Sequence, residues 1–275
     1  MMTATPVISM RQEKIAPVKP FFPSTVKVSA VIITYNEEKI IRRTLSRLYW
    51  CHEIIVVDSF STDNTVNIAK EFGCKVFTRV FDGYGPQKQF AVSQASNDWI
   101  LCVDADEVLS AELVQEIRDS LTEDTPFAGF SMPMNLIFLN KEFVHGKESN
   151  RHFLRLFNRR MGTFSDARVH EGLQIKGEVK KLQHIIRHYS YTSLHQYIEK
   201  CNKYTSYGAE MKYAKGKQRS LLMIIMALPF NFFKYYILDR NFMNGAQGFY
   251  WSVLSSNYHF LKYVKLKELQ SASAK

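Results

Sequence analysis

One short stretch constrains the fold of this 275-residue chain more than any other. The apolar run of residues 99–103 is followed at once by three carboxylates, at Asp104, Asp106 and Glu107. This pattern is typical of a buried strand that carries acidic side chains to its carboxyl end. Open α/β sheets bind ligands just beyond the carboxyl ends of their strands, and Asp-x-Asp suits a hard divalent cation held against a diphosphate. The alternative is a solvated acidic turn that caps the next helix.

The first part of the chain alternates between β-branched runs and amphipathic stretches. Short polar loops join them, and Ser61 or Thr62 is expected to cap the second helix. Such alternation predicts a mostly parallel sheet covered by helices on both faces, which is an α/β fold. The expected strands cover residues 28–34, 54–58, 75–77 and 99–103.

The pattern changes after Thr125. Residues 129–139 and 151–158 predict longer strands, and residues 162–175 predict a mixed region of loop and strand. Helical periodicity returns between Ser193 and Tyr213. Its apolar stripe is expected at Ile198, Cys201 and Tyr204, continued by Tyr207 or Met211.

Polar side chains follow three of the expected strands. They lie in residues 34–37, 58–59 and 104–106. Because the carboxyl ends of parallel strands share one edge of a sheet, a single pocket can collect all three groups. This convergence is more specific than any of the single motifs.

These motifs resemble those of the family 2 glycosyltransferases, which have the GT-A fold. Within that family the chain looks most like the bacterial lipopolysaccharide core β-1,4-glucosyltransferases. The resemblance implies a Rossmann-like, mostly parallel sheet flanked by helices, and it is strongest over residues 28–109. The matching segments are VIITYNE at 31–37, VVDSFSTDNT at 56–65, YGPQK at 84–88, WILCVDADE at 99–107, RLF at 155–157, VHE at 169–171 and NGAQGF at 244–249.

The resemblance implies a nucleotide-sugar donor and inversion at the anomeric carbon. Asp58 is expected to accept hydrogen bonds from the base or ribose, unless it only caps its own turn. Lys88 is expected to pair with donor phosphate, the alternative being a solvated helix lysine. Arg155 either faces the same pocket or lies on an exposed strand face. The expected donor-binding residues are Thr34, Tyr35, Asn36, Glu37, Asp58, Lys88, Asp104, Ala105 and Arg155.

The resemblance also implies a divalent metal, Mg²⁺ or Mn²⁺, bound by Asp106 with Asp104 and His170. The metal would neutralise charge on the leaving nucleoside diphosphate. An inverting displacement needs a base for the acceptor hydroxyl proton, usually the aspartate of a Glu-Asp pair in this family. The corresponding stretch departs from that form, so Glu171 is the candidate base and Asp166 the reserve. The alternative is that His170 and Glu171 form a structural surface pair.

The C-terminal part of the chain is basic and aromatic. The net charge is +10, and residues 211–275 hold ten basic residues against two acidic ones. Such a block suits an anionic surface, either lipid headgroups or nucleic acid. The sequence has no helix-turn-helix, RNA-recognition signature or paired zinc ligands, which argues against nucleic acid. We therefore expect a membrane-surface partner.

Residues 221–230 form an apolar run within this basic part. The run is too short to cross a bilayer, which needs roughly twenty residues. Extending it to Leu238 brings in Pro229, Asn231 and Lys234. We therefore expect either a helix in the membrane interface or a helix buried against the catalytic domain.

These interpretations divide the chain into three parts. Residues 1–24 are expected to be a flexible leader, because they lack the pattern of a signal peptide. Residues 25–192 are expected to form the GT-A domain, with a nucleotide-sugar half at 25–109 and an acceptor half at 110–192. Residues 193–275 are expected to form a helical region at the membrane surface. The four cysteines form no disulfide framework, which fits the cytoplasmic face of the bacterial inner membrane.

The expected function is metal-dependent transfer of a hexose from a UDP-sugar donor, UDP-glucose, to a heptose of the lipopolysaccharide inner core. The acceptor would therefore be a lipid-linked saccharide. The first alternative is another acceptor, such as a capsule precursor, a polyprenyl-linked sugar or a peptide. The second is a protein that binds nucleotide sugars without catalysis.

Overall fold

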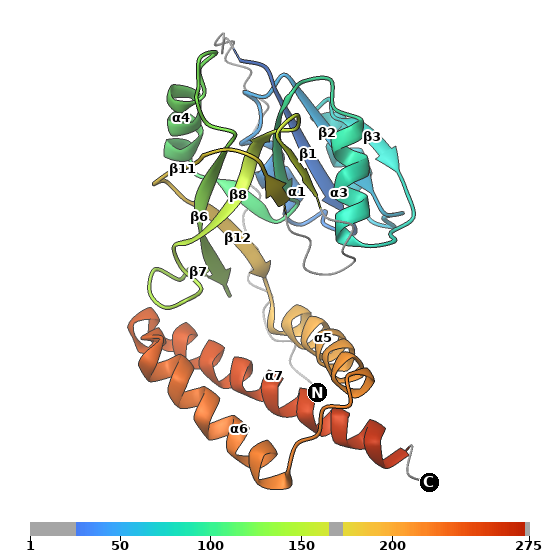
Figure 1. The fold of residues 1–275 in the computed structure, drawn as a ribbon, viewed down its shortest axis with the longest axis vertical. Coiled ribbons are helices and arrows are strands. Elements are labelled where there is room, and N and C mark those ends of the chain that lie inside the picture. The colour runs from blue at the N-terminus through green and yellow to red at the C-terminus, as the bar shows by residue number, and fades with distance from the viewer. Residues whose placement is uncertain (1–25, 165–172, 273–275) are drawn as a thin grey trace, which may run out of the picture.

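The computed structural model describes residues 26–164 and 173–272 of the chain. These residues form a curled mixed sheet flanked by helices, with a layer of longer helices below it (Figure 1). The expected leader at 1–24 lies outside the described residues.

The first half of the sheet is parallel, as predicted. Its strands are ordered β3-β2-β1-β4, and all of their carboxyl ends meet at one edge. Apolar residues, many of them β-branched, fill β1, β2 and β4 because both faces of the sheet are covered there. Their bounds are β1 Val28–Thr34, β2 Glu53–Asp58, β3 Lys75–Thr78 and β4 Trp99–Asp104.

The second half makes the sheet mixed. Strand β8 is antiparallel to both β4 and β6, so β6 and its parallel neighbour β12 run in the same direction as β4. Two small strands, β9 and β10, pair separately. The bounds are β5 Glu107–Leu109, β6 Gly129–Phe138, β7 Lys141–Glu142, β8 Arg151–Asn158, β9 Gly162–Phe164, β10 Leu173–Ile175, β11 Val179–Lys181 and β12 Ile186–Tyr191.

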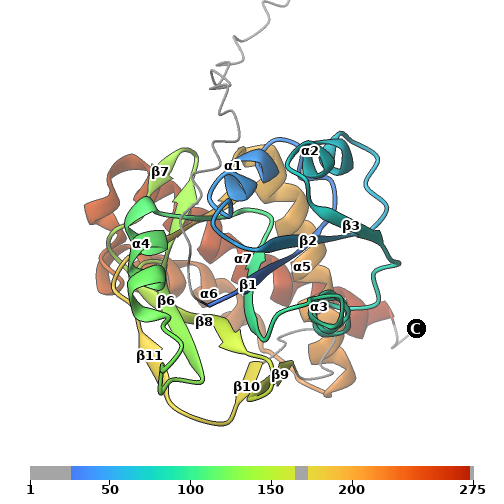
Figure 2. The same cartoon turned by 90° about the horizontal axis from the view of Figure 1, so that it is seen from above.

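Four short helices cover the two faces of the sheet (Figure 2). Alternate residues of β1 point to opposite faces, so Ile32 packs with α1, α2 and α4 while Val31 packs with α3. Ser110 caps α4, because its side chain accepts a hydrogen bond from the backbone N–H of Leu113. The bounds are α1 Ile41–Leu45, α2 Thr65–Glu71, α3 Tyr84–Ser93 and α4 Ala111–Ser120.

Longer helices form the layer that lies beyond the carboxyl ends of the strands (Figure 1). Helix α7 packs against both α5 and α6. A π-helical segment, Lys234–Leu238, and a 3₁₀ helix, Asn241–Asn244, connect α6 to α7. The bounds are α5 Leu194–Ala214, α6 Leu221–Phe233 and α7 Gly245–Ala272.

The predicted apolar stripe of α5 is wrong except for Cys201. The buried residues of this helix are instead Tyr197, Cys201, Thr205 and Ala209. Thr205 is tolerated inside because its hydroxyl donates to the backbone oxygen of Cys201 at 2.8 Å. These buried residues are spaced four apart, and three of them are small, which allows α7 to approach α5 closely. The larger apolar residues Ile198, Tyr204, Tyr207 and Met211 therefore stay exposed.

Helix α6 is not buried, so that alternative for residues 221–230 is wrong. It begins after Ser220, whose side chain accepts a hydrogen bond from the N–H of Met223, and it buries Ile224 and Ala227. The 18 residues Leu221–Leu238 are long and apolar enough to cross a membrane by length and composition, with 17% of them buried.

Candidate active site

The carboxyl edge of the parallel strands brings the predicted polar groups together. In the strand register Thr34 lies beside Asp58, and Ile33 lies beside Asp104. Strands β1, β2 and β4 therefore deliver their last side chains to one place, as the sequence predicted. The Thr34 hydroxyl is buried there and has no hydrogen-bond partner within the described residues.

The loop after β1 interlocks with the loop after β2. Asn36 has a positive φ of 54°, its N–H donates to Ser61 Oγ at 2.9 Å, and its side-chain oxygen accepts from the Thr62 N–H at 2.8 Å. The Glu37 N–H donates to Thr65 Oγ1 at 2.8 Å. These bonds fix the backbone of the expected nucleoside-binding loop. Tyr35 projects from it and is exposed.

Ser61 and Thr62 do not cap helix α2. The helix begins at Thr65, and the side chain of Asp63 accepts a hydrogen bond from the Thr65 N–H at 3.0 Å. Ser61 is instead held by Asp58, whose two carboxylate oxygens accept from the Ser61 N–H at 2.8 Å and from its hydroxyl at 2.5 Å. Asp58 therefore does cap its own turn, as the alternative proposed. A contact between Asp58 and a base or ribose stays a prediction.

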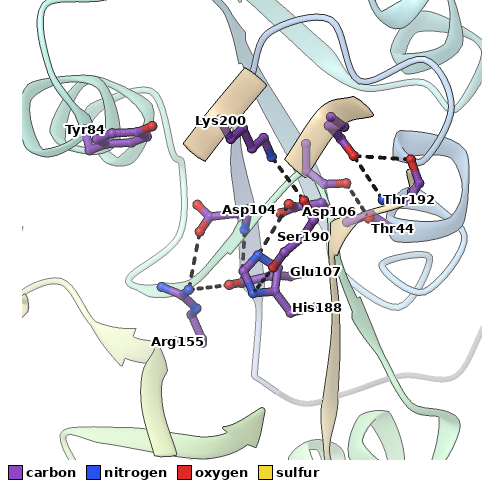
Figure 3. A network of polar contacts seen from close by, with 12 residues as sticks. Thr44, Tyr84, Asp104, Asp106, Glu107, Arg155, His188, Ser190, Thr192 and Lys200 are labelled. Carbon is purple, nitrogen blue, oxygen red and sulfur yellow. Dashed lines mark hydrogen bonds and ion pairs between the residues drawn. The ribbon is translucent and has the colours of Figure 1, made fainter. Parts of the chain in front are cut away.

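Asp104 lies between two cations, one of which, Arg155, is labelled in Figure 3. Lys88 Nζ is 3.0 Å from one carboxylate oxygen, and Arg155 Nη2 is 3.4 Å from the other. Lys88 is only 3% exposed, so the solvated-lysine alternative is wrong, and the Arg155 side chain is 14% exposed and faces this edge. Burial raises the pKa of Asp104, but the charges of Lys88 and Arg155 outweigh it and hold that pKa well below its usual range.

Glu107 completes this group, although the sequence did not mark it as a site residue. It is fully buried, accepts the Asp104 N–H at 3.1 Å and forms an ion pair with Arg155. Arg155 is therefore shared by two carboxylates. Glu107 could have been found in the sequence as the third acid of the motif. Its position in the site, however, follows from the turn between β4 and β5.

Asp106 faces a histidine that the sequence did not reveal. His188 Nε2, from β12, lies 3.3 Å from Asp106 Oδ2, and His188 Nδ1 lies 3.0 Å from Ser190 Oγ. Burial alone would lower the pKa of His188, but Asp106 raises it to about 9. His188 is therefore charged at neutral pH and lowers the pKa of Asp106 in turn.

Helix α5 brings Lys200 to the same edge (Figure 3). Its Nζ donates to the backbone oxygen of Ser190 at 3.2 Å. Glu37, on the opposite loop, has a pKa raised to about 7 by burial and by the negative charge of Asp106. Lys200 opposes this rise. Like His188, Lys200 is distant in sequence from the acidic motif, and no local spacing identified it.

The acidic groups fit a divalent cation whose remaining coordination positions are filled by a bound substrate. Within residues 26–164 and 173–272, no group of three or more His, Cys, Asp or Glu side chains could hold a metal ion alone. Burial is the main cause of the raised pKa of Glu37, and the negative charge of Asp106 adds to it. Mg²⁺ is commonly bound by one or two carboxylates together with substrate phosphates, and Asp106 with Asp104 provides such a pair.

The remaining predicted residues divide into two groups. Ala105 is buried, and its backbone oxygen accepts a hydrogen bond from Thr44 Oγ1 at 2.7 Å, which holds the acidic turn to α1. The candidate bases Glu171 and Asp166 and the candidate ligand His170 lie outside the described residues. Their roles stay predictions.

Comparison with known proteins identifies the family. Residues 29–168 match the model of glycosyl transferase family 2. The chain belongs to this family. It has the GT-A fold, here with C-terminal helices.

Two relatives align with this family 2 chain over most of its length. An uncharacterised glycosyltransferase of Rickettsia typhi is 34% identical over 263 residues, which cover 90% of this chain and 89% of that protein. The lipopolysaccharide core biosynthesis glycosyltransferase LpsC of Rhizobium meliloti is 27% identical over 255 residues, which cover 90% and 94%.

A solved structure is also similar to the chain. Mannosyl-3-phosphoglycerate synthase from Rubrobacter xylanophilus matches with 20% identity and a TM-score of 0.36, over 42% of this chain and 41% of that one.

Proposed function

We propose that this glycosyltransferase is an inverting, metal-dependent hexosyltransferase that moves glucose from UDP-glucose to a heptose of the lipopolysaccharide inner core. The observation that carries the proposal is the paired charge at the strand edge. Lys88 and Arg155 flank Asp104, while Asp106 lies beside His188 and near Lys200. Cations and acids in alternation suit a diphosphate that arrives with a divalent ion.

Each part of the edge has a place in this reaction. The interlocked loops of Asn36 and Asp58 hold the nucleoside, and Lys88 with Arg155 balances the charge of the diphosphate. When bound, Mg²⁺ or Mn²⁺ would be held by Asp106 and Asp104 and would neutralise charge on the leaving nucleoside diphosphate. Glu171, with Asp166 in reserve, takes the proton of the acceptor hydroxyl.

The acceptor assignment rests on similarity and on the C-terminal helices. LpsC of Rhizobium meliloti, which aligns with nearly the whole chain, is a lipopolysaccharide core biosynthesis glycosyltransferase. Inner-core acceptors are lipid-linked, and the exposed apolar helix α6 in a basic region suits such an acceptor. The enzyme would then work at the cytoplasmic face of the inner membrane.

The decisive experiment measures release of nucleoside diphosphate from a panel of UDP- and GDP-sugars. Detergent-solubilised core lipopolysaccharide that lacks its outer sugars serves as the acceptor, with Mn²⁺ or with EDTA. We expect turnover that needs UDP-glucose, metal and acceptor together. Donor binding with no turnover on any acceptor would contradict the proposal and favour a protein that only binds nucleotide sugars.

Replacing Asp106 tests the metal site directly. The Asp106→Ala protein should fold, yet transfer should fall on the order of a hundredfold or more, because a preorganised charge at the leaving group is lost. The matched control is Asp98→Asn, because Asp98 pairs with Arg160 at 2.8 Å in a more exposed position just before β4, at its amino end. A folded Asp106→Ala protein that transfers sugar at the wild-type rate would overturn this mechanism.

A further inference from the structure

Helix α6 exposes most of its apolar side chains. Only Ile224 and Ala227 are buried in this 13-residue helix. Monomeric soluble proteins rarely leave large contiguous apolar patches in water, so such a face generally meets a partner. The large apolar residues exposed on it are Leu221, Leu222, Met223, Ile225, Met226, Leu228, Phe230 and Phe233.

The sequence that flanks this face is mostly basic. From residue 211 to residue 238 the sequence has no acidic residue. Basic side chains precede the helix, and one follows it. An apolar face with basic flanks is complementary to a membrane surface that carries anionic lipids, where each basic residue adds to the attraction. The basic residues are Lys212, Lys215, Lys217, Arg219 and Lys234.

We infer that α6 docks the enzyme on an anionic bilayer by lying in the plane of the headgroups, with its exposed face in the acyl boundary. Helix α6 itself has 13 residues, and only together with the π-helical segment to Leu238 does it reach the 18 residues that could cross a bilayer by length and composition. Pro229 lies inside the helix, Asn231 donates to the backbone oxygen of Ala227 at 2.6 Å, and Lys234 follows. These polar features oppose a spanning continuation toward Leu238 and are tolerated at the interface.

Hydrogen bonds of Asn244, in the C-terminal part, fix the position of α6 relative to the sheet. The Asn244 side chain accepts from the N–H groups of Val144 and His145 at 3.3 Å, and donates to the backbone oxygen of His145 at 3.0 Å. The NGAQGF segment that begins at Asn244 thus joins the start of α7 to the loop between β7 and β8. Because α7 packs on α6, the orientation of α6 is tied to the catalytic sheet.

This arrangement turns the active site toward the membrane. The strands β6 and β12 point their carboxyl ends at the helical layer, and β4 runs in the same direction (Figure 1). An enzyme docked through α6 therefore presents the edge that bears Asp104 and Asp106 on its membrane side. This inference rests on the proposed function, in which a lipid-linked acceptor is held at the membrane surface. Its test, however, does not require sugar transfer.

The test is cosedimentation of the full chain with vesicles of phosphatidylcholine, alone or with phosphatidylglycerol. We expect binding that requires the anionic lipid and weakens with salt. Leu222→Glu/Met226→Glu should lower the partition coefficient at least about tenfold, because two exposed apolar anchors are lost. Lys215→Gln/Lys217→Gln should lower it roughly tenfold on anionic vesicles. The matched control, Val80→Glu, changes an exposed apolar residue on the β3–α3 loop and should bind like wild type.

The outcomes separate this inference from the proposed function. Wild-type protein that ignores anionic vesicles, or an L222E/M226E protein that binds them normally, would overturn it. So would a wild-type dimer that the same double substitution dissociates, because α6 would then contact a second copy. Transfer to detergent-solubilised acceptor should stay unchanged in L222E/M226E. If every protein lacks transfer while wild type still binds vesicles, the proposed function fails and the docking surface stands.

Discussion

Replacing Glu107 with glutamine isolates the buried charge that holds Arg155. Glu107 is fully buried, and the Arg155 side chain is 14% exposed. Burial raises the pKa of Glu107 above its usual range, and the adjacent guanidinium opposes part of that rise. The substitution removes one negative charge and keeps the shape of the side chain. Arg155 is then left with Asp104 as its one remaining carboxylate in the described part of the chain.

The expected loss of stability depends on which contacts Arg155 and Asp104 keep after the substitution. Removing one member of a buried ion pair typically costs about 3–5 kcal/mol. Here Asp104 remains 3.4 Å from Arg155, and the glutamine oxygen can still accept the Asp104 N–H. We therefore expect the free energy of unfolding to fall by about 2–3 kcal/mol, below the full cost of an abandoned charge. For a chain of this size that corresponds to a Tm lower by about 4–10 °C.

The assay compares the Tm and the urea midpoint of wild type and Glu107→Gln at pH 7. The matched control is Glu71→Gln, because Glu71 also pairs with an arginine, Arg42, but the two side chains are 54% and 41% exposed. An exposed pair contributes less than about 1 kcal/mol, so this control should barely move. Equal midpoints for the two variants would refute the reasoning, since burial would then make no difference to the pair.

Two further predictions concern the framework of the fold. Burial would raise the pKa of Glu53, but hydrogen bonds from Lys75 and its other neighbours lower it from 4.5 to about 2. Glu53→Gln should therefore lower stability by about 1–3 kcal/mol at pH 7, and urea denaturation should show this difference shrinking as pH falls from 4.5 toward 2. In Gly248→Ala the new Cβ would collide with the backbone oxygen of Asn241. This variant should melt well below Gly208→Ala, whose Cβ approaches the flexible side chain of Lys262 and lies at ordinary contact distance from the Tyr258 hydroxyl.

The sequence predicted the parallel half of the sheet because the local signals agree there. Strands β1, β2 and β4 are buried on both faces, so each is a continuous apolar run. Such a run can be recognised as a strand without an alternation of apolar and polar residues. The polar residues at their ends could be placed on one edge by the rule for parallel strands alone. Asp58 and Asp104 lie where that rule put them.

The other half of the site could not be predicted because its residues come from distant, unremarkable segments. His188 lies on a strand whose partners are set by tertiary pairing, and Lys200 is one of three lysines on helix α5. Their approach to Asp106 depends on the mixed half of the sheet. The exposed stripe of α5 was misread for a related reason, since apolar residues such as Ile198 suggested a buried face that small residues occupy instead.

The C-terminal helices share a core with the end of the catalytic sheet, and this changes how the site should be understood. Phe138 and Phe143 pack with Tyr197 of α5 and Trp251 of α7 in one buried cluster. Trp251 also donates from its indole N–H to Glu148 at 3.2 Å. Because this cluster fixes α5, it also fixes the position of Lys200 beside the acidic edge. The helical layer that we propose to dock on the membrane is therefore the same layer that brings Lys200 to the edge near Asp106.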